Sequence, residues 1–264
     1  MALQEGGADR SRSAPRSAPL SSVMQFVWRR LLASRRAVVV VALASAGLVL
    51  QSARLSDGMD GQLGRWFILR SSAQTFWLVL PLLVALAVGL EIAADRDGFL
   101  KLVRARGVSL MRWTSITAAT AAGVGGIVAV VPLGAGAVTL LILAPVTGTE
   151  MSGALPAGFG GADPLPWLIG ASILGGAAMA LVAVAVALWS GNRYLTVTLP
   201  AVMFSVIEVG PPAAFDAYKP VAHLALSSDW YSGNITASSV VLYWATISVA
   251  CLVGIAAWTM RRSI

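Results

Sequence analysis

The chain has 264 residues, of which 57% are hydrophobic and only 12% are charged. A soluble domain carries about 25% charged residues, so this composition excludes a soluble globule. It indicates a polytopic helical membrane protein, because the chain holds several apolar runs of the roughly 20 residues that cross a bilayer. One Cys and one His exclude an internal disulfide framework, a cysteine-rich metal site and a histidine cluster. Only two of the 19 basic residues are Lys, and with abundant Ala, Gly and Val this favours a bacterial source.

Two segments precede the first apolar run. Residues 1–19 are rich in Ser, Ala, Arg, Gly and Pro and lack an apolar period, which predicts a disordered cytoplasmic tail before a membrane domain over 20–264. Between Leu20 and Arg36 apolar and basic residues fall on opposite helical faces. This predicts an amphipathic helix in the inner interface, with its basic face toward anionic lipid. The alternative is an extension of the first span.

Six membrane spans are expected, over residues 37–51, 73–94, 113–146, 166–189, 194–209 and 238–260. The first is short, so Arg36 and Arg54 should snorkel at its ends. The alternative for this run is a cleaved signal peptide. Residues 53–72 form a polar loop in this scheme.

Prolines predict several irregularities. Pro81 should kink the second span by deleting one backbone hydrogen bond. The third run is too long for one straight crossing and should bend or break around Pro132, Gly134 and Gly136. The fifth span is short and stops at Pro211-Pro212. Residues 213–237 then alternate apolar and polar groups, which predicts short helices dipping into the outer interface.

The basic residues set the expected orientation. Fifteen of the 19 fall in the tails and loops that are inside if the N-terminus is cytoplasmic, and four fall in the outer loops. By the positive-inside rule both termini are cytoplasmic. The net charge of +7 then reflects topology, so no nucleic-acid partner is implied.

The chain lacks the groups of an autonomous enzyme or pump. Lys101 and Lys219 are its only lysines, and neither stands in a phosphate-binding loop. Apart from Glu91 and Glu208, near the ends of their helices, the expected spans hold no ionisable side chains of the kind that ion-coupled transport needs at depth. His223 and Cys251 are expected to be an ordinary interfacial residue and a packing residue. Any energy therefore arrives from another subunit.

Residues 91–112, EIAADRDGFLKLVRARGVSLMR, are the one long charged passage between apolar blocks. Asp97 and Lys101 are spaced i, i+4, which favours a helix after the second span. Gly107 can end that helix and Ser109 can cap the next. This predicts a short helix at the membrane surface, continuous with two spans. The alternative is a basic loop that contacts lipid headgroups.

This passage resembles the permease subunits of type-2 ABC transporters. In that family the second span ends in Glu, followed by an acidic residue and Gly, a hydrophobic-basic run and a small turn. These positions read here as Glu91, Asp97-Gly98, Phe99-Leu100-Lys101-Leu102-Val103 and Arg106-Gly107-Val108-Ser109. The family usually has Pro in the last turn, where this chain has Gly107. The resemblance implies an all-α, six-span fold with an interfacial N-terminal helix, a cytoplasmic coupling helix and a membrane-dipping hairpin before the last span.

The same resemblance implies a function. The chain would be the transmembrane subunit of an ATP-driven exporter in the bacterial plasma membrane, moving an amphiphile such as a peptide antibiotic, drug or lipid-like molecule. It would have no enzymatic activity or cofactor of its own, since ATP and Mg belong to separate ATP-binding subunits, and it would pair with a second or related permease. Coupling to the ATP-binding subunit would involve Glu91, Asp97, Gly98, Phe99, Leu100, Lys101, Val103, Arg104, Arg106 and Ser109. The alternative is a non-transporting anchor or sensor subunit that recruits a cytoplasmic partner.

Overall fold

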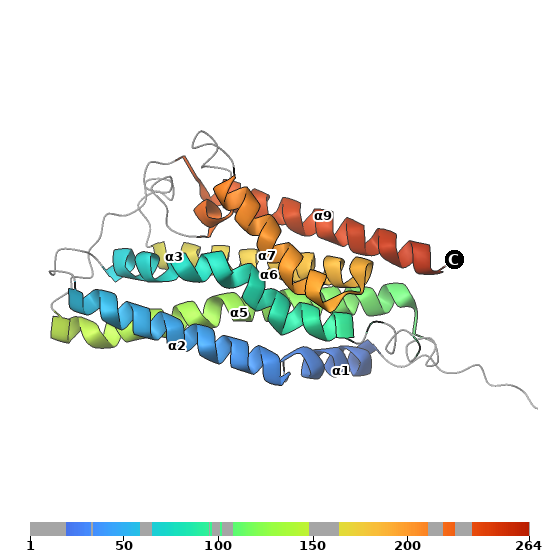
Figure 1. The fold of residues 1–264 in the computed structure, drawn as a ribbon, viewed down its shortest axis with the longest axis horizontal. Coiled ribbons are helices and arrows are strands. Elements are labelled where there is room, and N and C mark those ends of the chain that lie inside the picture. Colours follow the sequence, from blue (N-terminus) through green and yellow to red (C-terminus); the bar gives the residue numbers. More distant parts are fainter. Residues whose placement is uncertain are drawn as a thin grey trace, which may run out of the picture.

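The computed structural model describes residues 20–32, 34–58, 65–94, 96, 101, 108–147, 164–210, 219–224 and 234–263, and every element in these ranges is helical (Figure 1). The expected tail over residues 1–19 lies outside them. The elements are α1 (Leu20–Leu32), α2 (Arg35–Gly58), α3 (Arg65–Val84), the π-helix η1 (Ala85–Gly89), α5 (Leu110–Thr147), α6 (Pro164–Ser190), α7 (Arg193–Val209), the 3-10 helix η4 (Val221–His223) and α9 (Ala237–Ser263). The all-α prediction is confirmed for this part of the chain.

Five helices in the described ranges are long and apolar enough to cross a membrane, over Arg35–Arg54, Ala73–Ala94, Leu110–Leu143, Pro166–Ser190 and Ala237–Arg262. The sixth expected span corresponds to α7, which has 17 residues and is about 26 Å long at 1.5 Å per residue. This is shorter than the roughly 30 Å of a hydrocarbon core. The crossing by α7 therefore stays a prediction.

The N-terminal amphipathic segment is a separate helix. α1 ends at Leu32 and α2 begins at Arg35, and the Ser34 hydroxyl between them accepts a hydrogen bond from the Ala37 amide at 3.0 Å. This is an N-cap, which starts a new helix. The alternative that the segment simply extends the first span is thus wrong. Val27 and Leu31 of α1 are buried, and α1 contacts α5.

The bounds expected for the polar loop, residues 53–72, are also wrong. α2 continues to Gly58 and α3 already begins at Arg65. The polar residues of this stretch suggested a loop, yet Ala53, Arg54 and Leu55 are good helix formers. A helix can project polar side chains beyond the apolar part of its length, so the change in composition does not mark its end.

The second expected span is found over Ala73–Ala94, with an irregular turn after Pro81. The backbone is π-helical from Ala85 to Gly89 and α-helical again to Ala94. Pro81 lacks an amide proton and cannot bond to the carbonyl one turn back. A π-turn is rare, and where it interrupts an α-helix it is frequently found at functional sites.

The break expected near Pro132 in the third span is not found. α5 is helical without interruption from Leu110 to Thr147, 38 residues or about 57 Å. Pro132 removes one backbone hydrogen bond from α5. The residues near it pack closely against α2 and α3, which favours the continuous helix. Gly136 lies against Ser52 and Leu48 of α2 and Leu69 of α3, so its lack of a side chain permits close contact between helices.

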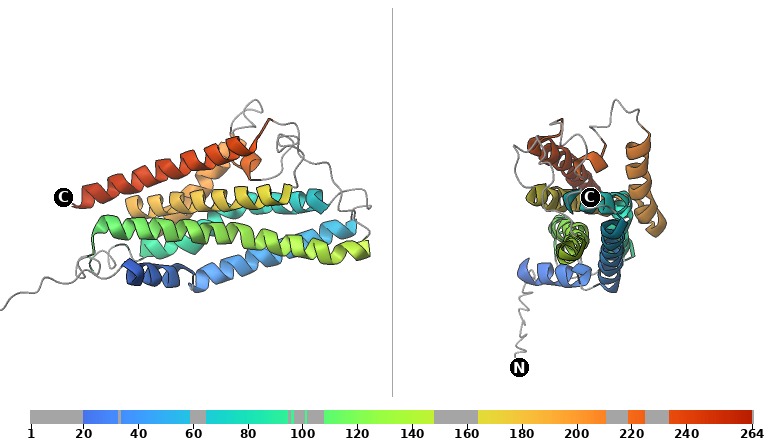
Figure 2. Two further views of the ribbon diagram at one scale, coloured as in Figure 1. Left: turned by 180° about the vertical axis from the view of Figure 1, so that it is seen from behind. Right: turned by 90° about the vertical axis from the view of Figure 1, so that its left-hand side faces the viewer.

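α5 and α6 cross at the centre of the bundle through two glycines. A Cβ on Gly125 would overlap the Gly176 carbonyl and the Ala180 methyl, and a Cβ on Gly176 would overlap the Gly125 carbonyl and the Ala129 methyl. Small residues at such a crossing let two backbones approach, which is a main source of helix association in lipid. The long helices run roughly along one axis, and α1 lies at the same end as the C-terminus (Figures 1 and 2).

Candidate functional site at the basic end of the bundle

The end of the bundle that holds α1, the start of α5, the α6–α7 turn and the C-terminus of α9 is called the basic end here. Its cationic residues in the described ranges are Arg29, Arg30, Arg35, Arg36, Arg96, Lys101, Arg112, Arg193, Arg261 and Arg262. These belong to the segments expected to be cytoplasmic. The end of the second span and the described parts of residues 91–112 also lie here.

Glu91, at the end of the second span, pairs with Arg36 at the start of α2. The distance from Arg36 Nη1 to Glu91 Oε1 is 3.2 Å, with side chains 53% and 20% exposed respectively. Since the pair is partly solvated, its contribution to stability is about 0.2–1 kcal/mol. The pair serves mainly to position two helices, because it joins the start of α2 to the end of the second span through residues 55 positions apart in sequence.

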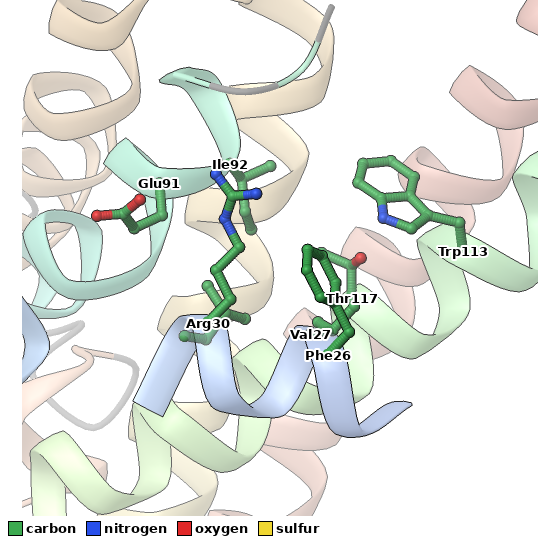
Figure 3. Close-up of a pocket in the computed structure, with 8 residues that line it drawn as sticks. Phe26, Val27, Arg30, Glu91, Ile92, Trp113 and Thr117 are labelled. Carbon is green, nitrogen blue, oxygen red and sulfur yellow. The ribbon is translucent and has the colours of Figure 1, made fainter. Parts of the chain in front are cut away.

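A small hollow of ≈ 30 Å³ adjoins Glu91, where α1 lies against the start of α5. Its lining residues are Phe26, Val27, Arg30, Leu31, Glu91, Ile92, Trp113 and Thr117. Figure 3 shows Arg30 rising from α1 toward Ile92 and Glu91, with Phe26 beside Thr117. The hollow thus joins the amphipathic helix, the end of the second span and the third span.

Arg96 attaches the segment after the second span to α6. Its Nη1 donates to the Leu188 carbonyl at 3.2 Å, in the last turn of α6. The last carbonyls of a helix lack intrahelical partners and carry partial negative charge, which a guanidinium satisfies.

The turn from α6 into α7 lies beside this contact. The Arg96 guanidinium lies against Gly191, whose φ of 62° is the left-handed conformation that glycine adopts without strain. The Asn192 side chain then accepts from the Tyr194 and Leu195 amides and caps α7. The expected tight turn over residues 190–193 is confirmed.

The C-terminal half of α9 is fastened to the same end. Trp189 Nε1 donates to the Gly254 carbonyl at 3.1 Å, and the Arg261 guanidinium lies 5.3 Å from the centroid of the Trp189 ring. The Thr114 and Thr259 hydroxyls are 3.2 Å apart and buried, which links α5 to α9. The ends of five helices are therefore joined by side-chain contacts.

Three of the ten expected coupling residues lie in the described ranges. Glu91 is placed as above, and Lys101 is helical and exposed. Ser109 caps α5, since its hydroxyl accepts from the Arg112 amide at 3.3 Å, which confirms the expected cap. The other seven lie outside the described residues, namely Asp97, Gly98, Phe99, Leu100, Val103, Arg104 and Arg106. The short surface helix that they would form is a prediction that the described residues do not reach.

Sequence reasoning missed the partners at this end. Arg36 was expected only to snorkel, and Arg96 was counted only as a loop charge. The partner of Arg96 is a backbone carbonyl 92 residues away, which has no sequence signal. For Arg36 a sequence signal exists, because the acidic Glu91 at the end of the second span favours a basic residue at the end of a neighbouring helix. The sequence does not show which arginine that is.

Polar contacts also gather at the opposite end. Glu208 accepts from the Val221 amide at 3.0 Å and so holds the start of η4. His223 is buried, stacks on Tyr243 with ring centroids 4.1 Å apart, and accepts from Trp244 Nε1 through its carbonyl. His223 is thus a packing residue, more buried than an ordinary interfacial one. Within the described ranges, no group of three or more His, Cys, Asp and Glu side chains could hold a metal ion.

An apolar cavity of ≈ 340 Å³ lies between α3, α6, α7 and α9. Pro81 and Pro200 line it, and so does Cys251. Its size is within the range of small-molecule sites, and its walls offer hydrocarbon contact rather than charge.

No protein-family model, curated protein or solved structure matches this chain.

Proposed function

We propose that the chain is the transmembrane subunit of an ATP-driven ABC exporter, working with separate ATP-binding subunits and a second permease. The first support is the shortage of intrinsic machinery. Glu91 and Glu208 are the only acidic side chains with described surroundings, and each has a structural partner at one end of the bundle. A body of this kind needs an external source of energy for active transport.

The observation that carries the proposal is the set of contacts that residues 91–112, which we name the joint, make with other helices. Its described residues contact two other helices, since Glu91 pairs with Arg36 of α2 and Arg96 caps α6, and Ser109 caps α5, which begins within the joint. A displacement imposed on the joint would therefore act on three spans at once. A nucleotide-driven partner that binds there could change the tilt of these helices without contacting them.

An amphiphilic substrate is the class that the interior favours. The ≈ 340 Å³ cavity is lined by apolar side chains and the Tyr243 ring, which suit the apolar part of a peptide, drug or lipid-like molecule. By the positive-inside rule, we expect the basic end, and with it the joint, to face the cytoplasm.

The experiment purifies the tagged chain from its own host and treats the sample with a photoreactive ATP analogue. A labelled co-purifying protein supports the proposal. Lys101→Cys in a Cys251→Ser chain should then cross-link to that protein, because Lys101 is exposed in the joint. Ser238→Cys, exposed at the start of α9 at the opposite end of the bundle, is the matched control and should not. Transport by the purified chain without nucleotide would refute the proposal.

The same system separates coupling from anchoring. Glu91→Gln should lower transport while the complex with the labelled protein stays intact. Loss of the complex with no separate effect on transport would instead favour the anchor or sensor subunit.

A further inference from the structure

A two-part hollow runs along α1 at the basic end. The wider part, of ≈ 450 Å³, is lined by Gln25, Phe26, Arg29 and Arg30. The narrower part is the ≈ 30 Å³ hollow that reaches Thr117 (Figure 3). Phe26 and Arg30 line both parts, so the two adjoin each other at these side chains.

The wider part is cationic. Arg29 and Arg30 line it, and Arg35 and Arg36 follow on the next helix. The guanidinium is planar and offers five donors, a geometry that matches two oxygens of a phosphate group.

The narrower part presents a buried hydroxyl that lacks a partner. Thr117 is 3% exposed, and its Oγ1 has no hydrogen-bond partner among the described residues. Nearby threonines differ, since Thr120 donates to the Ile116 carbonyl at 2.8 Å and Thr114 to the Met111 carbonyl at 3.0 Å. A buried hydroxyl without a partner is costly. The space beside Thr117 is about that of one oxygen-sized group.

The surroundings suit an amphiphile from the bilayer. Met24, Phe26 and Trp28 of α1 are about half exposed, while Val27 and Leu31 are buried. Tryptophan rings such as that of Trp28 are favoured beside the lipid headgroup region. A ligand here would meet cations first, then a hydroxyl, with apolar side chains along its path.

We propose that this hollow binds an anionic glycerophospholipid. The phosphate lies between Arg29 and Arg30, and an ester carbonyl oxygen of the glycerol accepts a hydrogen bond from Thr117 Oγ1. The acyl chains lie beside the exposed apolar side chains of α1. The site belongs to the chain alone and does not depend on transport.

The test is native mass spectrometry of the full chain in detergent, titrated with phosphatidylglycerol and with phosphatidylcholine. The wild-type chain should retain phosphatidylglycerol preferentially. The double variant Arg29→Gln, Arg30→Gln should weaken that binding about 25-fold, because each arginine near an anionic lipid usually contributes about a fivefold gain in affinity. Thr117→Val keeps the side-chain shape and should weaken the binding of both lipids about fivefold, because both lipids have ester carbonyls.

Arg261→Gln with Arg262→Gln is the matched control, since it removes the same charge from the same end outside the hollow. It should leave the preference intact, and thermal unfolding should show that all variants remain folded. An equal loss of phosphatidylglycerol binding in the two double arginine variants would mean that the lipid is attracted to the basic end as a whole, and would overturn the site. Competition by inorganic phosphate at the concentration of the lipid would overturn the lipid as ligand. Unchanged binding in Thr117→Val would overturn the assigned ester contact.

Discussion

The guanidinium of Arg96 and the carbonyl of Leu188 are joined by a hydrogen bond of 3.2 Å that closes the last turn of α6. One residue belongs to the segment after the second span and the other to the fourth. Gly191 completes the arrangement, because its left-handed backbone turns the chain into α7 and its missing side chain leaves room for the guanidinium. The α6–α7 turn therefore depends on a residue remote in sequence.

Gly191→Ala should lower the free energy of unfolding by about 1–2 kcal/mol, the usual cost of a side chain in the left-handed region. The added methyl would also displace Arg96. Thermal unfolding in detergent measures the change. Gly170→Ala in α6 is the control, because a Cβ there meets nothing within 4 Å and the helix propensity improves. Equal stability of the two variants would contradict the role of the turn.

Gly125→Ala should destabilise the bundle by about 1–3 kcal/mol, the range for an overpacked core. The new methyl overlaps the Gly176 carbonyl, which is backbone and cannot rotate away. Gly134→Ala lies in the same helix with open space around its Cβ and should be neutral or stabilising. The same unfolding assay compares them. A harmless Gly125→Ala would mean that α5 and α6 do not touch at this point.

The Arg36–Glu91 pair should give a coupling energy of about 0.2–1 kcal/mol in a double-mutant cycle. Arg36→Gln, Glu91→Gln and the double variant complete the cycle, with stability as the readout. The coupling should shrink in high salt, because Arg36 is half exposed and its charge is screened. Zero coupling at low salt would argue against the contact.

Cys251 should react with neutral methyl methanethiosulfonate faster than with a quaternary-ammonium methanethiosulfonate. The thiol lines an apolar cavity, which a charged reagent enters only by losing its water. As the single cysteine of the chain it needs no background substitution. Lys101→Cys in a Cys251→Ser chain is the control, and its exposed thiol should react with both reagents. Matching rates at Cys251 would show that the cavity is open to water.

The long apolar elements could be predicted from sequence with good accuracy. The second span was expected at residues 73–94 and is found over Ala73–Ala94, and the fourth was expected at 166–189 and is found over Pro166–Ser190. Apolar runs bounded by polar residues fix such limits, because lipid admits little else. Where polarity changes inside one helix, as after Gln51, the same rule fails and α2 runs on to Gly58.

The candidate site could be predicted only in part. The Ser109 cap follows from a local signal and is found where expected, since a helix cap depends on residues within one turn. The coupling role of Glu91 stays a prediction, and its pairing with Arg36 was not expected. The contacts of Arg96 with Leu188 and of Trp189 with Gly254 depend on backbone atoms brought together by folding. A carbonyl oxygen is the same at every position, so sequence carries no mark of which one is used.

α5 keeps its helical backbone through Pro132, Gly134 and Gly136 over about 57 Å. The backbone stays helical along this whole length, so no break separates the two halves of α5. Torque applied beside Ser109 would then emerge near Thr147, at the opposite end of the bundle, as rotation of the same sense. Inserting one residue at mid-length would turn the far half by about 100°, the angle set by 3.6 residues per turn, and put the two ends out of phase.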